Sequence, residues 1–169
     1  MLTLQVMISS GCLKQQNGGS FMQFQVDKQD GIIPQILTQI LDGCINGVTL
    51  SDPDIEDNPI VFANQVFEKI TGYTKEEIIG KNCRFLQGDL RDQPEIAQIK
   101  EAVKNRTPIE VTLKNFRKNG ELFYNRLSIK PLFDGEGRLI YFLGVQYDVT
   151  EKKLAKMEID QLNKCLAAF

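Results

Sequence analysis

The sequence predicts an α+β domain in which short helices cover one face of a five-stranded antiparallel sheet. Two short strand patterns come first, helical patterns fill the middle, and three long strand patterns close the domain. The 169 residues, 42% of them hydrophobic, suffice for one core with extensions rather than for two domains. We expect a flexible arm at 1–31, a flanking helix at 32–46, the domain at 47–149 and a terminal helix at 150–169.

The first 31 residues are rich in Gln, Gly and Ser and show no sustained hydrophobic period, which is typical of a flexible arm. Pro34 then fits the first turn of an amphipathic helix. The apolar residues at helical spacing are Ile36, Leu37, Ile40, Leu41 and Cys44. Such a helix either packs on the domain or pairs with a second copy of the chain.

The domain opens with two short strands, at 47–51 and 60–64, joined by a loop rich in Asp, Asn and Pro. Helical signals follow at 65–73, at Thr74 with the sequence TKEE behind it, and at 94–105 with a proline at its start. Several short helices therefore cover one face of the sheet.

Three long strand patterns close the domain, at 108–118, 121–133 and 137–150. The dipeptides Asn119-Gly120 and Asp134-Gly135 separate them, and both are strong signals for hairpin turns. Between this sheet and the helices we expect room for a small ligand.

A C-terminal helix capped by Thr150 carries an apolar seam with alternating spacings of four and three. The seam residues are Ala155, Ile159, Leu162, Leu166 and Phe169. The pattern fits the start of a coiled coil, but it also fits an amphipathic helix docked on its own sheet. Both arrangements remain open, and both can occur in different states.

Composition excludes several classes of function. The chain has no histidine, which excludes histidine-ligated haem, a Ser-His-Asp triad and a phosphoaccepting histidine. A net charge of -2 disfavours direct nucleic-acid binding, and no apolar run is long enough to span a membrane. The cysteines, Cys12, Cys44, Cys83 and Cys165, form no C-x-x-C pair. We therefore expect no metal site, reduced thiols and a cytoplasmic location.

The segment GKNCRFLQG, residues 80–88, places Cys83 among polar neighbours. An isolated cysteine would most often be a buried core thiol, but a purely apolar site would not need Asn82, Arg84 and Gln87 beside it. This run resembles the signature of LOV domains, the light-oxygen-voltage branch of the PAS superfamily. The resemblance extends over about 47–150 and includes TGYTKEEIIGKNCRFLQGD and YFLGVQYDVT.

The resemblance implies a PAS fold that encloses a flavin, with FMN as the cofactor, and a blue-light photoreceptor as the function. It implies that Cys83 forms a reversible cysteinyl-flavin adduct on illumination. It also implies that Asn82 and Gln87 bond the ribityl chain and that Arg84 binds the phosphate, for which a guanidinium is suited. Many family members have a second arginine where this sequence has Lys100, which keeps the charge but loses the bidentate geometry.

Arg91 is a possible substitute for that second phosphate ligand. On the strand side, inward-pointing amides are costly unless they are paired. By resemblance, Asn115 and Asn125 read the pyrimidine edge of the flavin. Gln146 contacts the carbonyl and ring nitrogen near the reacting carbon, and its rotation relays the signal to the terminal helix.

The apolar walls of the expected site are also ordinary core positions. They are Phe67, Leu86, Leu127, Ile129, Phe142 and Gly144. Two residues depart from the common family pattern: Thr49 stands where an apolar residue usually lines the pocket, and Gly47 precedes it. Either departure could alter the lifetime of the adduct.

We expect a sensor rather than an enzyme, acting as a homodimer through its flanking helices or on a downstream effector domain or protein. A flavin oxidoreductase is disfavoured because the sequence has no G-x-G-x-x-G fingerprint. The alternative is a PAS-type ligand-sensing or dimerisation module without photochemistry, which would have no use for Cys83.

Overall fold

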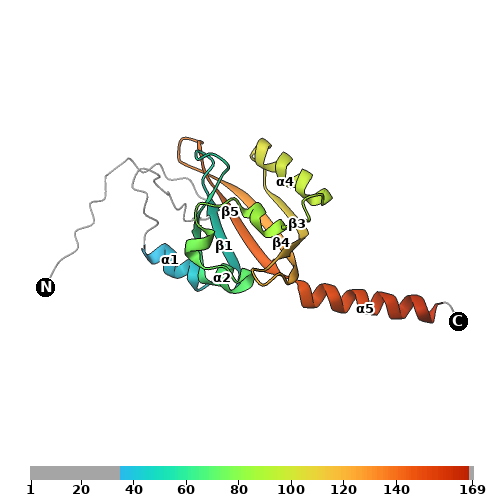
Figure 1. Cartoon of the computed structure of the whole chain (residues 1–169). Helices are drawn as coiled ribbons and strands as arrows, with labels where there is room; N and C mark the ends of the chain where they lie inside the picture. The colour runs from blue at the N-terminus through green and yellow to red at the C-terminus, as the bar shows by residue number, and fades with distance from the viewer. Residues whose placement is uncertain (1–34, 168–169) are drawn as a thin grey trace, which may run out of the picture.

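The computed structural model describes residues 35–167, and its centre is a five-stranded sheet with strand order β2-β1-β5-β4-β3 (Figure 1). Every neighbouring pair of strands is antiparallel. The strands are β1 (Gly47–Ser51), β2 (Ile60–Ala63), β3 (Ile109–Phe116), β4 (Leu122–Phe133) and β5 (Leu139–Asp148). The predicted α+β class and the five antiparallel strands are confirmed.

Four short helices cover one face of this sheet, between β2 and β3 in the chain (Figure 1). They are α2 (Gln65–Thr71), α3 (Lys75–Ile78), the 3-10 helix η2 (Cys83–Gln87) and α4 (Pro94–Asn105). The flanking helices are α1 (Gln35–Asp42) and α5 (Thr150–Leu166). The arm predicted at 1–31 lies outside the described residues. Within 35–167, no helix combines the length and apolarity needed to cross a membrane.

Burial alternates along β3, β4 and β5, because successive side chains of a strand point to opposite faces. On β5 the buried positions are Ile140, Phe142, Gly144 and Gln146. The strand register places buried residues of neighbouring strands opposite one another. Gly144 lies opposite Thr49 on β1, and Gln146 lies opposite Leu127 on β4. One face of the sheet thus points at the covering helices.

The two predicted hairpins both form, but the second turn differs in detail from the expectation. In the first, the glycine of the predicted Asn-Gly dipeptide, Gly120, takes a positive φ of 85°. In the second, Gly137 rather than Gly135 takes a positive φ, of 78°. The reason is local: the Asp134 carboxylate accepts hydrogen bonds from the backbone N–H groups of Glu136 and Arg138, and the Asp134 N–H donates to the carbonyl of Arg138, which puts Gly137 at the last position of the turn.

Asn64 joins three elements at the start of the domain. Its side-chain Oδ1 accepts from the backbone N–H groups of Val48 (2.8 Å) and Phe67 (3.0 Å), the second as the N-cap of α2. Its Nδ2 donates to the carbonyls of Leu41 (2.8 Å) and Asn46 (3.0 Å). A fully buried amide with four hydrogen bonds therefore ties the end of α1 to β1 and α2.

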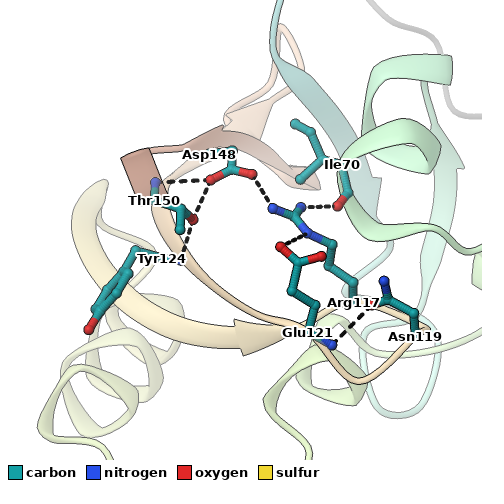
Figure 2. Close-up of polar contacts among 7 residues, drawn as sticks. All are labelled: Ile70, Arg117, Asn119, Glu121, Tyr124, Asp148 and Thr150. Carbon is teal, nitrogen blue, oxygen red and sulfur yellow. Dashed lines mark hydrogen bonds and ion pairs between the residues drawn. The ribbon is translucent and has the colours of Figure 1, made fainter. Parts of the chain in front are cut away.

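The junction between β5 and α5 is held by a polar cluster around Arg117 and Asp148 (Figure 2). The guanidinium of Arg117 donates to Asp148 at 2.6 Å and to the carbonyl of Ile70 at the end of α2. The Thr150 hydroxyl donates to Asp148 Oδ1 and accepts from the backbone N–H of Tyr124 on β4. Burial raises the pKa of Asp148, but hydrogen bonds from Thr150 and Arg117 outweigh this and hold it below its ordinary 3.8.

Helix α5 extends away from the domain (Figure 1), and none of its described residues is buried. Its exposed large apolar side chains are Leu154, Met157, Ile159, Leu162 and Leu166. Four predicted seam positions, Ala155, Ile159, Leu162 and Leu166, are therefore exposed, and Phe169 lies outside the described residues. In this structure the helix does not dock on its own sheet, which leaves the coiled-coil arrangement available.

Replacing Asn64 by alanine should lower the free energy of unfolding by about 3 kcal/mol, because the change removes an N-cap and leaves buried backbone groups unpaired. Urea denaturation followed by circular dichroism measures this. Asn105→Ala, at an exposed asparagine that bonds Glu101, should cost well under half as much. Equal losses in the two variants would contradict the structural role assigned to Asn64.

Arg117→Gln should lower the free energy of unfolding by about 2 kcal/mol at pH 7, since it removes charge-assisted hydrogen bonds at a largely buried side chain. The exposed Arg138 provides the control, because Arg138→Gln removes surface ion pairs worth under about 1 kcal/mol.

The same junction predicts a pH dependence. Because the folded pKa of Asp148 lies below its unfolded value, its stabilisation is complete above the unfolded value of 3.8 and is lost as pH falls through the folded value. Urea midpoints between pH 6 and pH 2 should therefore fall less steeply in Asp148→Asn than in the unaltered chain. Parallel curves would count against this assignment.

Candidate functional site

The middle of the helix-covered sheet face belongs to β5, because β5 is the third of the five strands in space. Phe142, Gly144 and Gln146 alternate along it, and all three are buried. Their neighbours on this face include Thr49 on β1 and Leu127 on β4. These five predicted site residues thus meet in one region.

Buried apolar side chains of the described residues gather in clusters on either side of this region. One cluster, under α2, α3 and η2, contains Ile60, Ala63, Phe67, Ile78 and Leu86. The other, on β3 and β4, contains Val111, Leu113 and Leu127, with Ile129 packed against it. Four of the predicted apolar wall residues therefore divide between the two clusters, Phe67 and Leu86 in the first and Leu127 and Ile129 in the second. The other two, Phe142 and Gly144, lie on β5.

The three predicted amides lie on the same face, and two of them bond each other. Asn125 Nδ2 donates to Asn115 Oδ1 at 3.0 Å, and Asn115 Nδ2 donates to the carbonyl of Lys114. Among the described residues, Asn125 Oδ1 and Gln146 Oε1 are buried without a hydrogen-bond partner. A buried oxygen without a donor costs about 1–3 kcal/mol, so each one indicates a place for a ligand donor.

Gly144 keeps the face open beside these amides. A Cβ atom built at this glycine would lie 2.6 Å from Thr49 Oγ1 and 3.0 Å from Gln146 Nε2. Any larger residue would push these two polar groups apart. The glycine is therefore required for the approach of Thr49 to Gln146, whose Nε2 donates to Thr49 Oγ1 at 3.3 Å.

Cys83 begins η2, and its half-buried side chain packs against the cluster that contains Phe67 and Leu86. Burial raises the pKa of its thiol to about 11, although hydrogen bonding to the Thr49 and Ser51 hydroxyls acts in the opposite direction. The thiol is therefore protonated at neutral pH.

The polar neighbours of Cys83 turn toward the loop between β1 and β2. Asn82 caps η2 by accepting from the backbone N–H of Arg84, and its Nδ2 donates to the carbonyl of Asp57. Arg84 forms an ion pair with the Asp57 carboxylate at 2.5 Å, where both side chains are about half exposed (52%). These side chains therefore share Asp57 as a partner.

The other predicted polar contacts lie farther out. Gln87 ends η2 and is partly buried, whereas Lys100 is exposed on α4 one turn after the buried Ile96. Arg91 is also exposed, and its Nε donates to the carbonyl of Gly88. The amides predicted to face the ring are thus buried, whereas Arg84, Arg91 and Lys100, predicted for the phosphate, are exposed.

Sequence reasoning missed three contributors. Asp57 contacts both Asn82 and Arg84, Ser51 supplies a hydroxyl to Cys83, and Asn64 fixes the strand that carries Thr49. The N-cap position of Asn64 before a helical pattern could have indicated a cap. The roles of Asp57 and Ser51 depend on tertiary contacts that no local pattern encodes.

The site combines two buried amide oxygens without donors, an apolar cluster on each side, and the Cys83 thiol. This combination fits a planar heterocycle with polar edges. Carboxamides can both donate and accept, so they match alternating carbonyl and N–H groups without adding charge. The residues present therefore fit a flavin ring. Within 35–167 there is no group of three or more metal-ligating side chains.

Comparison with known proteins agrees with this chemistry. The PAS domain family matches residues 45–151. A blue-light photoreceptor of Listeria innocua is 49% identical over 115 residues, which are 68% of this chain and 45% of that protein. A blue-light-activated histidine kinase of Brucella ovis is 42% identical over 118 residues, which are 70% of this chain and 24% of that protein.

A light-oxygen-voltage domain studied with a flavin analogue superposes with a TM-score of 0.64 at 37% identity, covering 77% of this chain and 96% of that one. The chain spans less than half the length of the two curated relatives. The family predicted from the motif around Cys83 is confirmed. With the family match, the fold and this likeness in agreement, the chain belongs to the PAS domain family and to its light-oxygen-voltage branch.

Proposed function

We propose that this chain is a blue-light sensor that holds FMN on the helix-covered face of its sheet and bonds it reversibly through Cys83. A flavin chromophore follows from membership of the light-oxygen-voltage branch. FMN in particular is proposed because two exposed cationic side chains, Arg84 and Lys100, are available to bind a terminal phosphate at the surface.

The observation that carries this proposal is the pair of buried, unpartnered oxygens, Asn125 Oδ1 and Gln146 Oε1. Two such oxygens on neighbouring strands would be destabilising unless a ligand supplied donors. The pyrimidine edge of a flavin offers an N–H between two carbonyls, and each amide can turn to match it. Asn115 supports the set because its Oδ1 accepts a hydrogen bond from Asn125 Nδ2.

At the rim, the ribityl and phosphate roles proposed for Asn82, Gln87 and Arg84 require some exchange of partners. Arg84 is paired with Asp57, so a phosphate would share or displace that carboxylate. A half-exposed ion pair is worth about 1 kcal/mol or less, so this exchange is cheap. Lys100 adds charge from α4, with Arg91 as its substitute.

When bound, the flavin would supply light absorption and an electrophilic carbon next to a basic ring nitrogen. Cys83 would supply both the sulfur for the bond to that carbon and, as its S–H bond broke, the proton for the nitrogen. The high thiol pKa keeps that proton in place in the dark. Thermal reversal returns the proton to Sγ, so no external oxidant or reductant is needed.

We propose that Gln146 relays the event to α5. Its amide can accept from a newly protonated nitrogen only by turning, which changes the hydrogen bonds at the end of β5. Two residues farther along, Asp148 holds the start of α5 through Thr150. The exposed apolar face of α5 would then pair with a second copy of the chain. The other flanking helix, α1, would take part in the same dimer.

The output lies in an effector, which we propose to be a further domain or a separate protein. In Brucella ovis the similar segment belongs to a histidine kinase, of which it makes up 24%. We propose that the described part of this chain senses light and catalyses no turnover of its own. A cytoplasmic location remains a prediction from the cysteine spacing.

The first test is the absorption spectrum of the purified chain before and after blue light. We expect a flavin spectrum that bleaches and recovers in the dark, and Cys83→Ala should abolish the bleaching because no thiol remains to bond the ring. Cys44→Ala, at a thiol that bonds Ile40 in α1, should leave the cycle unchanged. A persistent flavin spectrum in the unaltered chain would contradict the photochemistry, and absence of flavin would favour a ligand-sensing module without it.

Gln146→Leu should retain the bleaching but weaken the structural response, because leucine cannot exchange a donor for an acceptor. Light scattering and circular dichroism in dark and light measure the oligomeric state and the helix content. Asn115→Leu is the matched control, because it also replaces a buried amide but lies on β3, two strands away from β5 in the sheet. This variant should retain the light response if flavin still binds. An undiminished response in Gln146→Leu would rule out its role as relay.

A further inference from the structure

Gln93 stands at the N-cap position of α4, but within the described part of the chain its side chain makes no capping hydrogen bond. Its amide instead bonds the backbone of the edge strand β3. Oε1 accepts from the N–H of Lys114 at 2.7 Å, and Nε2 donates to the carbonyl of Lys114 at 2.9 Å. Nε2 also donates to the carbonyl of Leu90 at 2.8 Å. One side chain therefore fastens the segment between η2 and α4 to β3.

The two bonds between Gln93 and Lys114 take the place of a neighbouring strand. Strand β3 is the last strand of the sheet, and no strand of residues 35–167 lies beyond it. An edge residue would otherwise leave its backbone N–H and carbonyl to water. The N–H and the carbonyl of one residue belong to two adjacent peptide planes. An amide that bonds both groups therefore fixes the direction of the Lys114 carbonyl.

The same carbonyl accepts a second hydrogen bond, from the buried amide of Asn115. Asn115 Nδ2 donates to it at 3.0 Å, and the two lone pairs of a carbonyl oxygen allow both bonds. A backbone carbonyl can only accept, so Asn115 turns its Nδ2 toward Lys114 and its Oδ1 toward Asn125. Asn125 then donates through Nδ2 at 3.0 Å. The last oxygen of this amide row, Asn125 Oδ1, is buried and has no partner among the described residues.

We propose that Gln93 is a positioning residue that fixes the polarity of this amide row through the Lys114 carbonyl, an inference that rests on the proposed function. The row runs one way, because each Nδ2 donates toward the edge of the sheet. At its inner end it therefore presents an acceptor, and a ligand must bring an N–H group to Asn125 Oδ1. Gln93 thus determines, from outside the site, which ring edges the site accepts.

The other end of the same segment also lies against β3. Gly88 follows η2 with a φ of 51°, and a Cβ atom built there would lie 2.8 Å from Cδ2 of Phe116. The segment 88–93 is thus held on β3 at two points, Phe116 and Lys114. Because the Gly88 contact stays when Gln93 is replaced, a Gln93 variant should fold. Its effect should then be confined to the amide row.

The first test is a fluorescence titration of the full chain, in the dark, with FMN and with FMN methylated at the ring N–H between the two carbonyls. The unaltered chain should prefer FMN, because the methyl group removes the donor that Asn125 Oδ1 requires. Gln93→Ala should weaken FMN binding about tenfold and binding of the methylated flavin less than about twofold, so the preference falls. An equal loss for both flavins would indicate a merely structural role and overturn the proposal.

A second variant, Gln93→Glu, keeps the shape of the side chain but removes its donor. The carboxylate can accept from the N–H of Lys114 but repels the carbonyl, so the preference for FMN should fall as in Gln93→Ala. Gln98→Ala is the matched control, because it removes an exposed glutamine of α4. It should keep both affinities within about twofold. A full preference for FMN in Gln93→Glu would overturn the proposal.

The second test needs neither flavin nor light. In the full chain without flavin, nuclear magnetic resonance reports the side-chain Nδ2 groups of Asn115 and Asn125 directly. Gln93→Ala should shift both signals, whereas Gln98→Ala should leave them in place. Unmoved signals in Gln93→Ala would overturn the proposal. If the unaltered chain binds neither flavin, the proposed function fails, and the shift of these signals still decides the role of Gln93.

Discussion

A buried amide must find partners for both its donor and its acceptor, and this constraint governs the two halves of the domain in opposite ways. At Asn64 every partner comes from the protein itself, and the result is a rigid joint between α1, β1 and α2. At Asn125 and Gln146 the oxygens remain without donors. The same chemistry therefore stabilises the scaffold at one place and provides a binding edge at the other.

The scaffold could be predicted well where local sequence decides structure. Short strand patterns around an Asp-, Asn- and Pro-rich loop located β1 and β2, and two turn dipeptides separated β3, β4 and β5. The proline at the start of α4 matched its observed beginning at Pro94. The β4–β5 turn departed from the prediction because the Asp134 side chain, not the Asp-Gly dipeptide, determines its shape. The hydrogen bond from Asn64 to the carbonyl of Leu41 joins residues 23 positions apart, so no local pattern could predict it.

The candidate site was predictable for a different reason. The short segment around Cys83 and the three strand amides carry the family resemblance, so their residue types could be named, and the register then brings Thr49, Gly144 and Gln146 to one face. The partners of these residues could not be named. The Thr49–Gln146 bond spans 97 positions and depends on β1 lying beside β5, and the Arg84–Asp57 pair depends on a loop conformation with positive φ at Asp57.

The cap of α5 has a mechanical consequence. Because Thr150 bonds both Asp148 and the backbone of Tyr124, the first turn of the helix is clamped to β4 and β5, while the rest stands free. Seventeen residues at 1.5 Å each make a lever arm about 25 Å long. A tilt of about 10° at the clamp would displace the tip sideways by about 4 Å, less than the helical pitch of about 5.4 Å. A small adjustment at the end of a strand would thus become a displacement of several ångströms at the far end of the helix.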